Sequence, residues 1–68
     1  RQAHEEFPDD PTVLFNLACA ESLLRRADDA VDHLGQSIGI DESFGELAQT
    51  DSDFDSIRDD PRFKELVG

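Results

Sequence analysis

The sequence has very little of what marks a secreted or membrane-bound protein. Its one cysteine, Cys19, allows no internal disulfide, so nothing points to an oxidising compartment. No apolar run approaches the roughly 18 residues that a bilayer-spanning helix requires. No signal peptide is expected, and because the chain starts at Arg1 we expect a fragment or a processed product. A cytoplasmic location is therefore expected.

Basic residues are also scarce. Six Lys and Arg face 17 Asp and Glu, which gives a net charge of -11 and a pI near 4.2. Nucleic acids and anionic membranes are bound by clustered Lys and Arg, so both are excluded as expected partners. A protein or peptide partner is expected to be neutral or basic, and the spread of the acids along the chain is typical of a solvated surface.

Groups that carry chemistry are few and scattered. The only imidazoles, His4 and His33, lie far apart in the sequence and lack a short metal-ligand spacing. The four glycines stand singly, so no Gly-rich phosphate loop is present. No base and orienting group accompany Cys19, which is expected to be a small semi-buried residue. We therefore expect no enzyme, no catalytic residue, no metal site and no cofactor.

The chain also has few hydrophobic residues with which to build a core. Hydrophobic residues make up 37% of 68 residues, and a chain of this length buries only about 60% of its unfolded surface. This size excludes a large catalytic chamber and favours dependence on a partner or a neighbouring domain.

Four segments show helical patterns, and none alternates long enough to form a strand, so the expected fold class is all-α. Asp10-Pro11 and Asp60-Pro61 each supply an N-cap followed by a proline in the first turn. The first pair opens a helix over 11–24, and the second opens the last helix. A second helix follows at once, with Asp28 and Asp29 at its start, Gly39 as its stop and a surface Asp29–His33 pair.

The short connection forces the first two helices to run antiparallel. Ser43 and Glu46 form a capping box that opens a short helix over 44–50. The acidic stretch that follows, Asp51 to Asp55, is expected to form one irregular turn. The expected core consists of Leu14, Leu17, Ala18, Ala30, Val31, Leu34 and Ile38, with Phe44, Leu47, Phe54 and Phe63 closing its end.

The residues of the first two helices resemble a tetratricopeptide repeat. Leu14, the run Asn16-Leu17-Ala18, Ala30, Leu34 and a final Asp41 stand at the spacings of that family, and the unit from Pro11 to Phe44 spans one 34-residue period. The expected parts are therefore the tail of a preceding repeat over 1–8, a helix–turn–helix repeat over 9–42 and a C-terminal cap over 43–68. The sequence of Asp51–Phe63 is similar to the C-terminal ends of bacterial tetratricopeptide proteins.

The resemblance implies a protein-interaction scaffold whose binding groove is lined by the first helix of the repeat. In that helix Asn16 could hydrogen-bond a peptide backbone, and Phe15 could supply an apolar anchor. The partner-binding residues that the resemblance implies are Thr12, Phe15, Asn16, Cys19, Ser22 and Leu23. Since stacked repeats bury a continuous core only with several units, self-association into a homo-oligomer is a further expectation.

Two alternatives remain open. In the first, the chain is a non-catalytic structural cap appended to a larger protein whose activity lies upstream. In the second, the acidic segment 51–59 binds a cation weakly, because Asp51, Asp53, Asp55 and Asp59 have the spacing of the first ligands of an EF-hand loop. Against calcium, Arg62 stands where such a loop ends in a bidentate Glu.

Overall fold

The structure, a computed structural model, describes residues 10–68. Over that range it is all-helical without a strand, which confirms the expected fold class. The elements are α2 (Pro11–Leu23), α3 (Ala27–Ile40), α4 (Ser43–Thr50), the 3-10 helix η1 (Ser52–Ile57) and α5 (Pro61–Val67). The expected tail of a preceding repeat over 1–8 lies outside the described residues.

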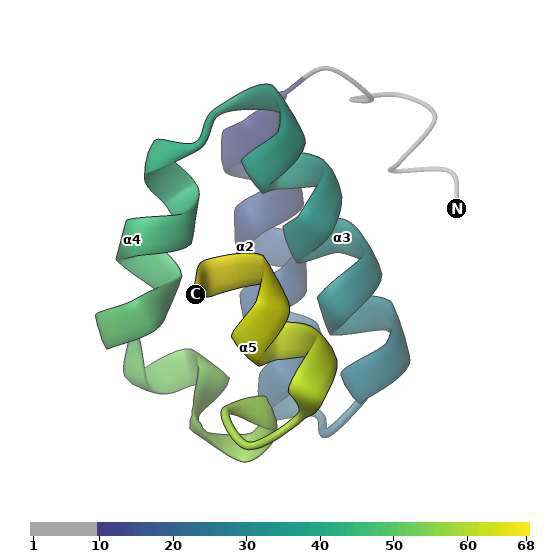
Figure 1. Cartoon of the computed structure of the whole chain (residues 1–68). Coiled ribbons are helices and arrows are strands. Elements are labelled where there is room, and N and C mark those ends of the chain that lie inside the picture. Colours follow the sequence, from purple (N-terminus) through teal and green to yellow (C-terminus); the bar gives the residue numbers. More distant parts are fainter. Residues whose placement is uncertain (1–9) are drawn as a thin grey trace.

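The helices surround one core (Figure 1). α2 and α3 lie side by side and run in opposite directions, and the chain then crosses to α4 on the other side of α2. η1 passes along α2, and α5 packs between α3 and α4. The C-terminal segment 43–68 therefore folds back over the first two helices.

Both Asp-Pro pairs open helices as predicted. The Asp10 carboxylate accepts hydrogen bonds from the backbone N–H of Thr12 at 3.0 Å and of Val13 at 3.3 Å. The Asp60 carboxylate accepts from the N–H of Arg62 at 2.9 Å. Each proline fills a position where a missing N–H costs nothing.

Two predicted helix ends are wrong. Ser43 does not cap α4: it is the first helical residue, and its hydroxyl donates to Asp41 Oδ1 at 2.7 Å. The backbone N–H of Ser43 donates to the same oxygen at 3.0 Å, so Asp41 takes the capping role. The Ser43 hydroxyl, and then its N–H, hold the pKa of Asp41 below its usual range. At the other site, α3 continues through Gly39 to Ile40, since Gly39 has an ordinary negative φ.

The turn between α2 and α3 depends on a left-handed arginine. Arg25 has a φ of 62°, and its N–H donates to Ser22 O at 2.9 Å. The N–H of Arg26 donates to Glu21 O at 2.8 Å. These two bonds form a Schellman motif, in which the left-handed position is usually glycine.

Replacing Arg25 by glycine is expected to stabilise the protein. An L-residue in the left-handed region destabilises the fold by roughly 1–2 kcal/mol, and glycine removes this strain. Glycine also loses more conformational entropy on folding, which offsets about 0.5–1 kcal/mol of the gain. Arg25→Gly should therefore raise the free energy of unfolding by roughly 0.5–1 kcal/mol in urea titrations. Arg25→Ala removes the same charge but keeps the strain, and should give no gain; an equal gain from both variants would contradict the argument.

The core agrees with the prediction in its centre and departs from it at two leucines. Leu14, Ala18, Ala30, Leu34, Phe54 and Phe63 are at most 1% exposed. Val31, Ile38 and Phe44 are half-buried and pack against this cluster. Leu17 is only half-buried, and Leu47 is exposed, so neither has the central place predicted for it.

His33 has a cross-hairpin partner that the sequence did not indicate. Its Nδ1 lies 2.7 Å from Glu21 Oε1, and both side chains are largely buried. The pair joins α2 to α3. The pair with Asp29 stays a prediction.

Candidate partner-binding face of α2

The six residues predicted to bind a partner do not share one accessible face. Phe15, Cys19 and Ser22 are buried, whereas Thr12, Asn16 and Leu23 are exposed. Phe15, Cys19 and Ser22 therefore lie in the core and not on a face open to a partner. The physical reason is that η1 and Phe44 of α4 pack over that side of α2.

Aromatic rings cover Phe15. Its ring centroid lies 5.0 Å from that of Phe44 and 5.5 Å from that of Phe54, in tilted and edge-on arrangements. Phe54 in turn lies 5.6 Å from Phe63. Such contacts are typical of a packed core, so Phe15 anchors the C-terminal segment and is not available to a partner.

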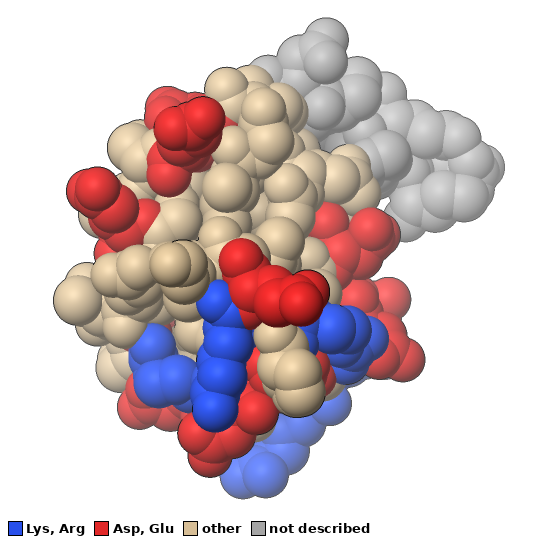
Figure 2. Space-filling model, viewed as in Figure 1, with Lys and Arg blue, Asp and Glu red and all other residues tan. Residues whose placement is uncertain are grey.

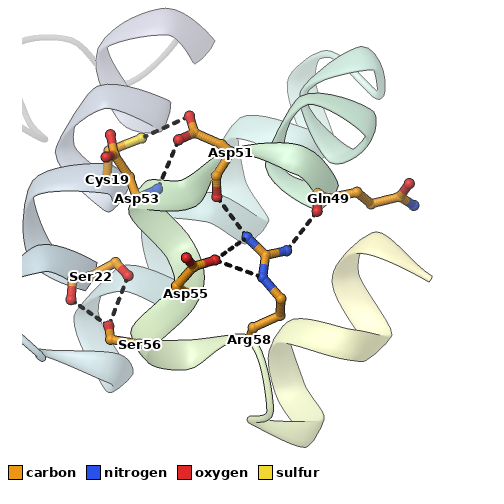
Figure 3. A network of polar contacts seen from close by, with 8 residues as sticks. All are labelled: Cys19, Ser22, Gln49, Asp51, Asp53, Asp55, Ser56 and Arg58. Carbon is orange, nitrogen blue, oxygen red and sulfur yellow. Dashed lines mark hydrogen bonds and ion pairs between the residues drawn. The ribbon is translucent and has the colours of Figure 1, made fainter.

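Polar contacts close the same side further along α2 (Figure 3). The Ser56 hydroxyl donates to Ser22 O at 2.6 Å, and the two hydroxyl oxygens lie 3.1 Å apart. The Cys19 thiol points to Asp51 Oδ2 at 3.9 Å. η1 therefore covers the side of α2 that carries Phe15, Cys19 and Ser22 through both apolar and polar contacts.

The other side of α2 is exposed and forms a continuous stripe. Thr12, Asn16, Ala20 and Leu23 recur at the three- and four-residue spacing that places side chains on one helix face. Leu24, the C-cap, extends it, and Leu23 and Leu24 are 63% and 69% exposed. We call Thr12, Asn16, Ala20, Leu23 and Leu24 the α2 stripe. The spacing was visible in the sequence, but Ala20 and Leu24 were not among the predicted site residues.

The α2 stripe carries no charge, although 34% of the residues of the chain are charged. Opposite charges stand at its two ends: Asp10 before Pro11, and Arg25-Arg26 after Leu24. Val13 and Leu17, both half-buried, follow Thr12 and Asn16 in the sequence and extend the apolar surface beside the stripe. Leu23 and Leu24 are the large apolar side chains that this face exposes.

The remaining cations lie elsewhere. Figure 2 shows the face of the molecule that lies opposite α2. Basic side chains gather over the lower half of this face, near the α2–α3 turn, the end of η1 and α5. Arg58 is paired with Asp55, and Arg62 is paired with Asp28 and Asp60. Arg25, Arg26 and Lys64 make no ion pair within residues 10–68.

The acidic segment 51–59 holds itself together through capping and ion pairing. Asp51 Oδ1 accepts from the N–H of Asp53 at 2.9 Å, and Asp55 pairs with Arg58 at 3.0 Å. Within the described range, the one group with three convergent metal-ligating atoms combines Asp51 and Asp53 with Cys19, whose ligand atoms lie within 4.8 Å of one another. The carboxylates of Asp51 and Asp55 are thus engaged by a backbone N–H and by a guanidinium.

The Cys19 thiol is unsuited to nucleophilic chemistry. Burial raises its pKa, the nearby carboxylates of Asp51 and Asp53 add to the effect, and the value reaches about 12. A raised pKa disfavours the thiolate, which is the nucleophilic form of cysteine. Its role in the structure is a packed residue beneath η1.

Comparison with known protein families, with curated proteins and with solved structures finds no match to this chain. Among the helices that the structure describes, none has the length and apolar character to cross a bilayer.

Proposed function

We propose that this chain is a non-catalytic helical interaction module of tetratricopeptide type, which binds a helix or peptide of a partner protein along the α2 stripe. The observation that carries the proposal is the stripe itself: every exposed position from Thr12 to Leu24 is uncharged. Exposed apolar surface has a free-energy cost that contact with a partner removes.

The chemistry of the stripe narrows the class of partner. Leu23 and Leu24 offer apolar contact, Asn16 offers both a donor and an acceptor, and Ala20 lets a second helix approach closely. The net charge of -11 repels acidic segments at long range, so a neutral or basic amphipathic helix fits best. A cytoplasmic location accompanies the proposal because its one cysteine is a free thiol.

A display library of helical peptides of about 20 residues tests the proposal. We expect selected peptides to be neutral or basic, and their affinity to fall at least tenfold for Ala20→Glu, which places a charge in the middle of the stripe. Lys64→Gln changes the net charge by the same amount on α5 and should leave binding unchanged. Peptides that bind both variants equally, or a selection of acidic peptides that bind more tightly at low salt, would contradict the proposed site.

A second candidate function is a structural cap. It is favoured by the way segment 43–68 covers the side of α2 that carries Phe15, Cys19 and Ser22. A terminal unit of a helical array closes its core with such a segment. In that case the α2 stripe would pack against the neighbouring unit of the same polypeptide. The test is to extend the chain with upstream residues and to measure its stability. If the extension stabilises the protein and Ala20→Glu abolishes that effect, the result favours the cap over the binding module.

A further inference from the structure

We propose that a second copy of this chain is a partner of the α2 stripe, and that the two α2 helices pair antiparallel about a two-fold axis. This inference rests on the proposed function and deepens it by naming the occupant: the α2 stripe of a second copy is itself an uncharged helix face, although the chain that carries it is acidic. The argument comes from the charges at the two ends of the stripe and from the small residue near its middle.

The ends of the stripe are electrostatically complementary to each other. Asp10 is exposed at the N-terminal end, and Arg25 and Arg26 are exposed at the C-terminal end. Asp10 uses Oδ1 to cap α2, and the arginines make no ion pair within residues 10–68. A surface whose two ends attract each other matches a second copy turned by 180°.

Antiparallel pairing satisfies both ends in one register. When Thr12 lies opposite Leu24 of the second copy, Asn16 lies opposite Ala20, and Asp10 faces the Arg25-Arg26 turn that follows Leu24. This contact between Asp10 and the turn then forms twice, because a two-fold axis repeats each contact. A parallel pairing would bring Asp10 against Asp10 and Arg26 against Arg26, which is repulsive.

The middle of the stripe permits close approach. Ala20 has the smallest side chain there, and Asn16 of the second copy packs over it beside the axis. Helix axes come within about 8–10 Å of each other when the contact residues are small. α2 has 13 residues, so the contact is about 20 Å long at a rise of 1.5 Å per residue.

The pairing is expected to be weak. One pair of helices buries less than the roughly 1,200 Å² typical of stable complexes, and each chain carries a net charge of -11. A dissociation constant on the order of 0.1–1 mM is expected. The experiment belongs at about 0.15 M salt, where the Debye length of about 8 Å screens the general repulsion more than the close ion pairs.

Sedimentation equilibrium of the whole chain between about 10 µM and 1 mM should show a monomer–dimer equilibrium. Ala20→Glu and Arg26→Glu should each weaken it at least tenfold. Lys64→Glu makes the same change in net charge as Arg26→Glu, at an exposed site on α5, and should leave the equilibrium near that of the parent. A chain that stays monomeric at 1 mM, or a dimer indifferent to Ala20→Glu and Arg26→Glu, would overturn the pairing.

Cysteine cross-linking tests whether the two α2 helices run antiparallel or parallel. In a Cys19→Ala background, a mixture of Thr12→Cys and Leu24→Cys chains should form the mixed disulfide. Neither variant alone should cross-link, because like positions lie about 18 Å apart along the antiparallel pair. Cross-linking of Thr12→Cys with itself would overturn the antiparallel arrangement.

The two proposals fail separately. A monomeric chain that still binds helical peptides through Ala20 overturns self-pairing and leaves the interaction module standing. A chain that neither dimerises nor binds peptides at this face overturns both.

Discussion

Phe54→Ala is expected to lower the free energy of unfolding by about 3–5 kcal/mol, the range for removing a fully buried aromatic ring. Phe54 has no exposed surface, and its ring lies between those of Phe15 and Phe63, at centroid distances of 5.5 Å and 5.6 Å. It is the residue through which η1 joins α2 to α5. A domain of this size has roughly 3–5 kcal/mol in total from its core, so the variant should be largely unfolded at 25 °C.

Urea unfolding followed by far-UV circular dichroism measures this effect. Phe54→Leu keeps most of the apolar volume and should cost less than about 1.5 kcal/mol. Leu47→Ala removes a side chain that is 53% exposed, so its effect should stay within roughly 0.5–1 kcal/mol. A Phe54→Ala protein that melts within a few degrees of the parent would show that η1 is not part of the cooperative core.

The starts of the helices could be read from the sequence because capping is a local interaction. Asp10 and Asp60 each bond to an N–H two residues ahead, so neighbouring residues contain all the information needed. Ser43 shows the limit of that reasoning. Asp41 offers a charged acceptor two residues earlier, and a carboxylate binds the free N–H groups more strongly than a hydroxyl does.

The buried face of α2 could not be predicted, because this helix is apolar around most of its circumference. Leu14, Phe15, Leu17 and Leu23 point in different directions, so the helical period does not say which side lies inward. Two partners decide the matter: α3 covers one side and η1 a second. The resemblance to a tetratricopeptide repeat placed the binding groove on the side that η1 covers.

The contacts that cover that side join residues far apart in sequence. Ser22 meets Ser56, and Cys19 meets Asp51, across more than 30 positions. No periodicity or spacing encodes such pairs, because they depend on how the C-terminal segment returns over α2. The α2 stripe could be identified only from the structure, because it consists of the α2 residues that the C-terminal segment leaves uncovered.

Arg58→Ala is expected to cost about 2–3 kcal/mol, because one guanidinium holds three parts of the C-terminal segment together (Figure 3). It donates to the carbonyl oxygens of Gln49 and Asp51, each at 2.6 Å, and to Asp55 Oδ1 at 3.1 Å. The two carbonyls belong to the C-terminal end of α4, which attracts a cation. The guanidinium carbon also lies 5.6 Å from the centre of the Phe63 ring.

Arg62 provides the matched control. It also pairs with two carboxylates, Asp60 and Asp28, but its own side chain is 49% exposed and that of Asp28 is 90% exposed. Exposed ion pairs contribute roughly 0–1 kcal/mol, so Arg62→Ala should have a small effect. Arg58→Lys should fall between the parent and Arg58→Ala, because one ammonium keeps the charge but does not match the planar fork that spans two carbonyls.

Amide hydrogen exchange locates the loss. In Arg58→Ala, the amides of the last turn of α4 and of η1 should exchange faster than those of α3, because the end of α4 has lost its cap. Equal destabilisation by Arg58→Ala and Arg62→Ala would mean that the count of ion pairs, and not the capping of α4, determines the effect. A uniform rise in exchange across all helices, with no excess at α4, would instead mean that Arg58 acts only on global stability.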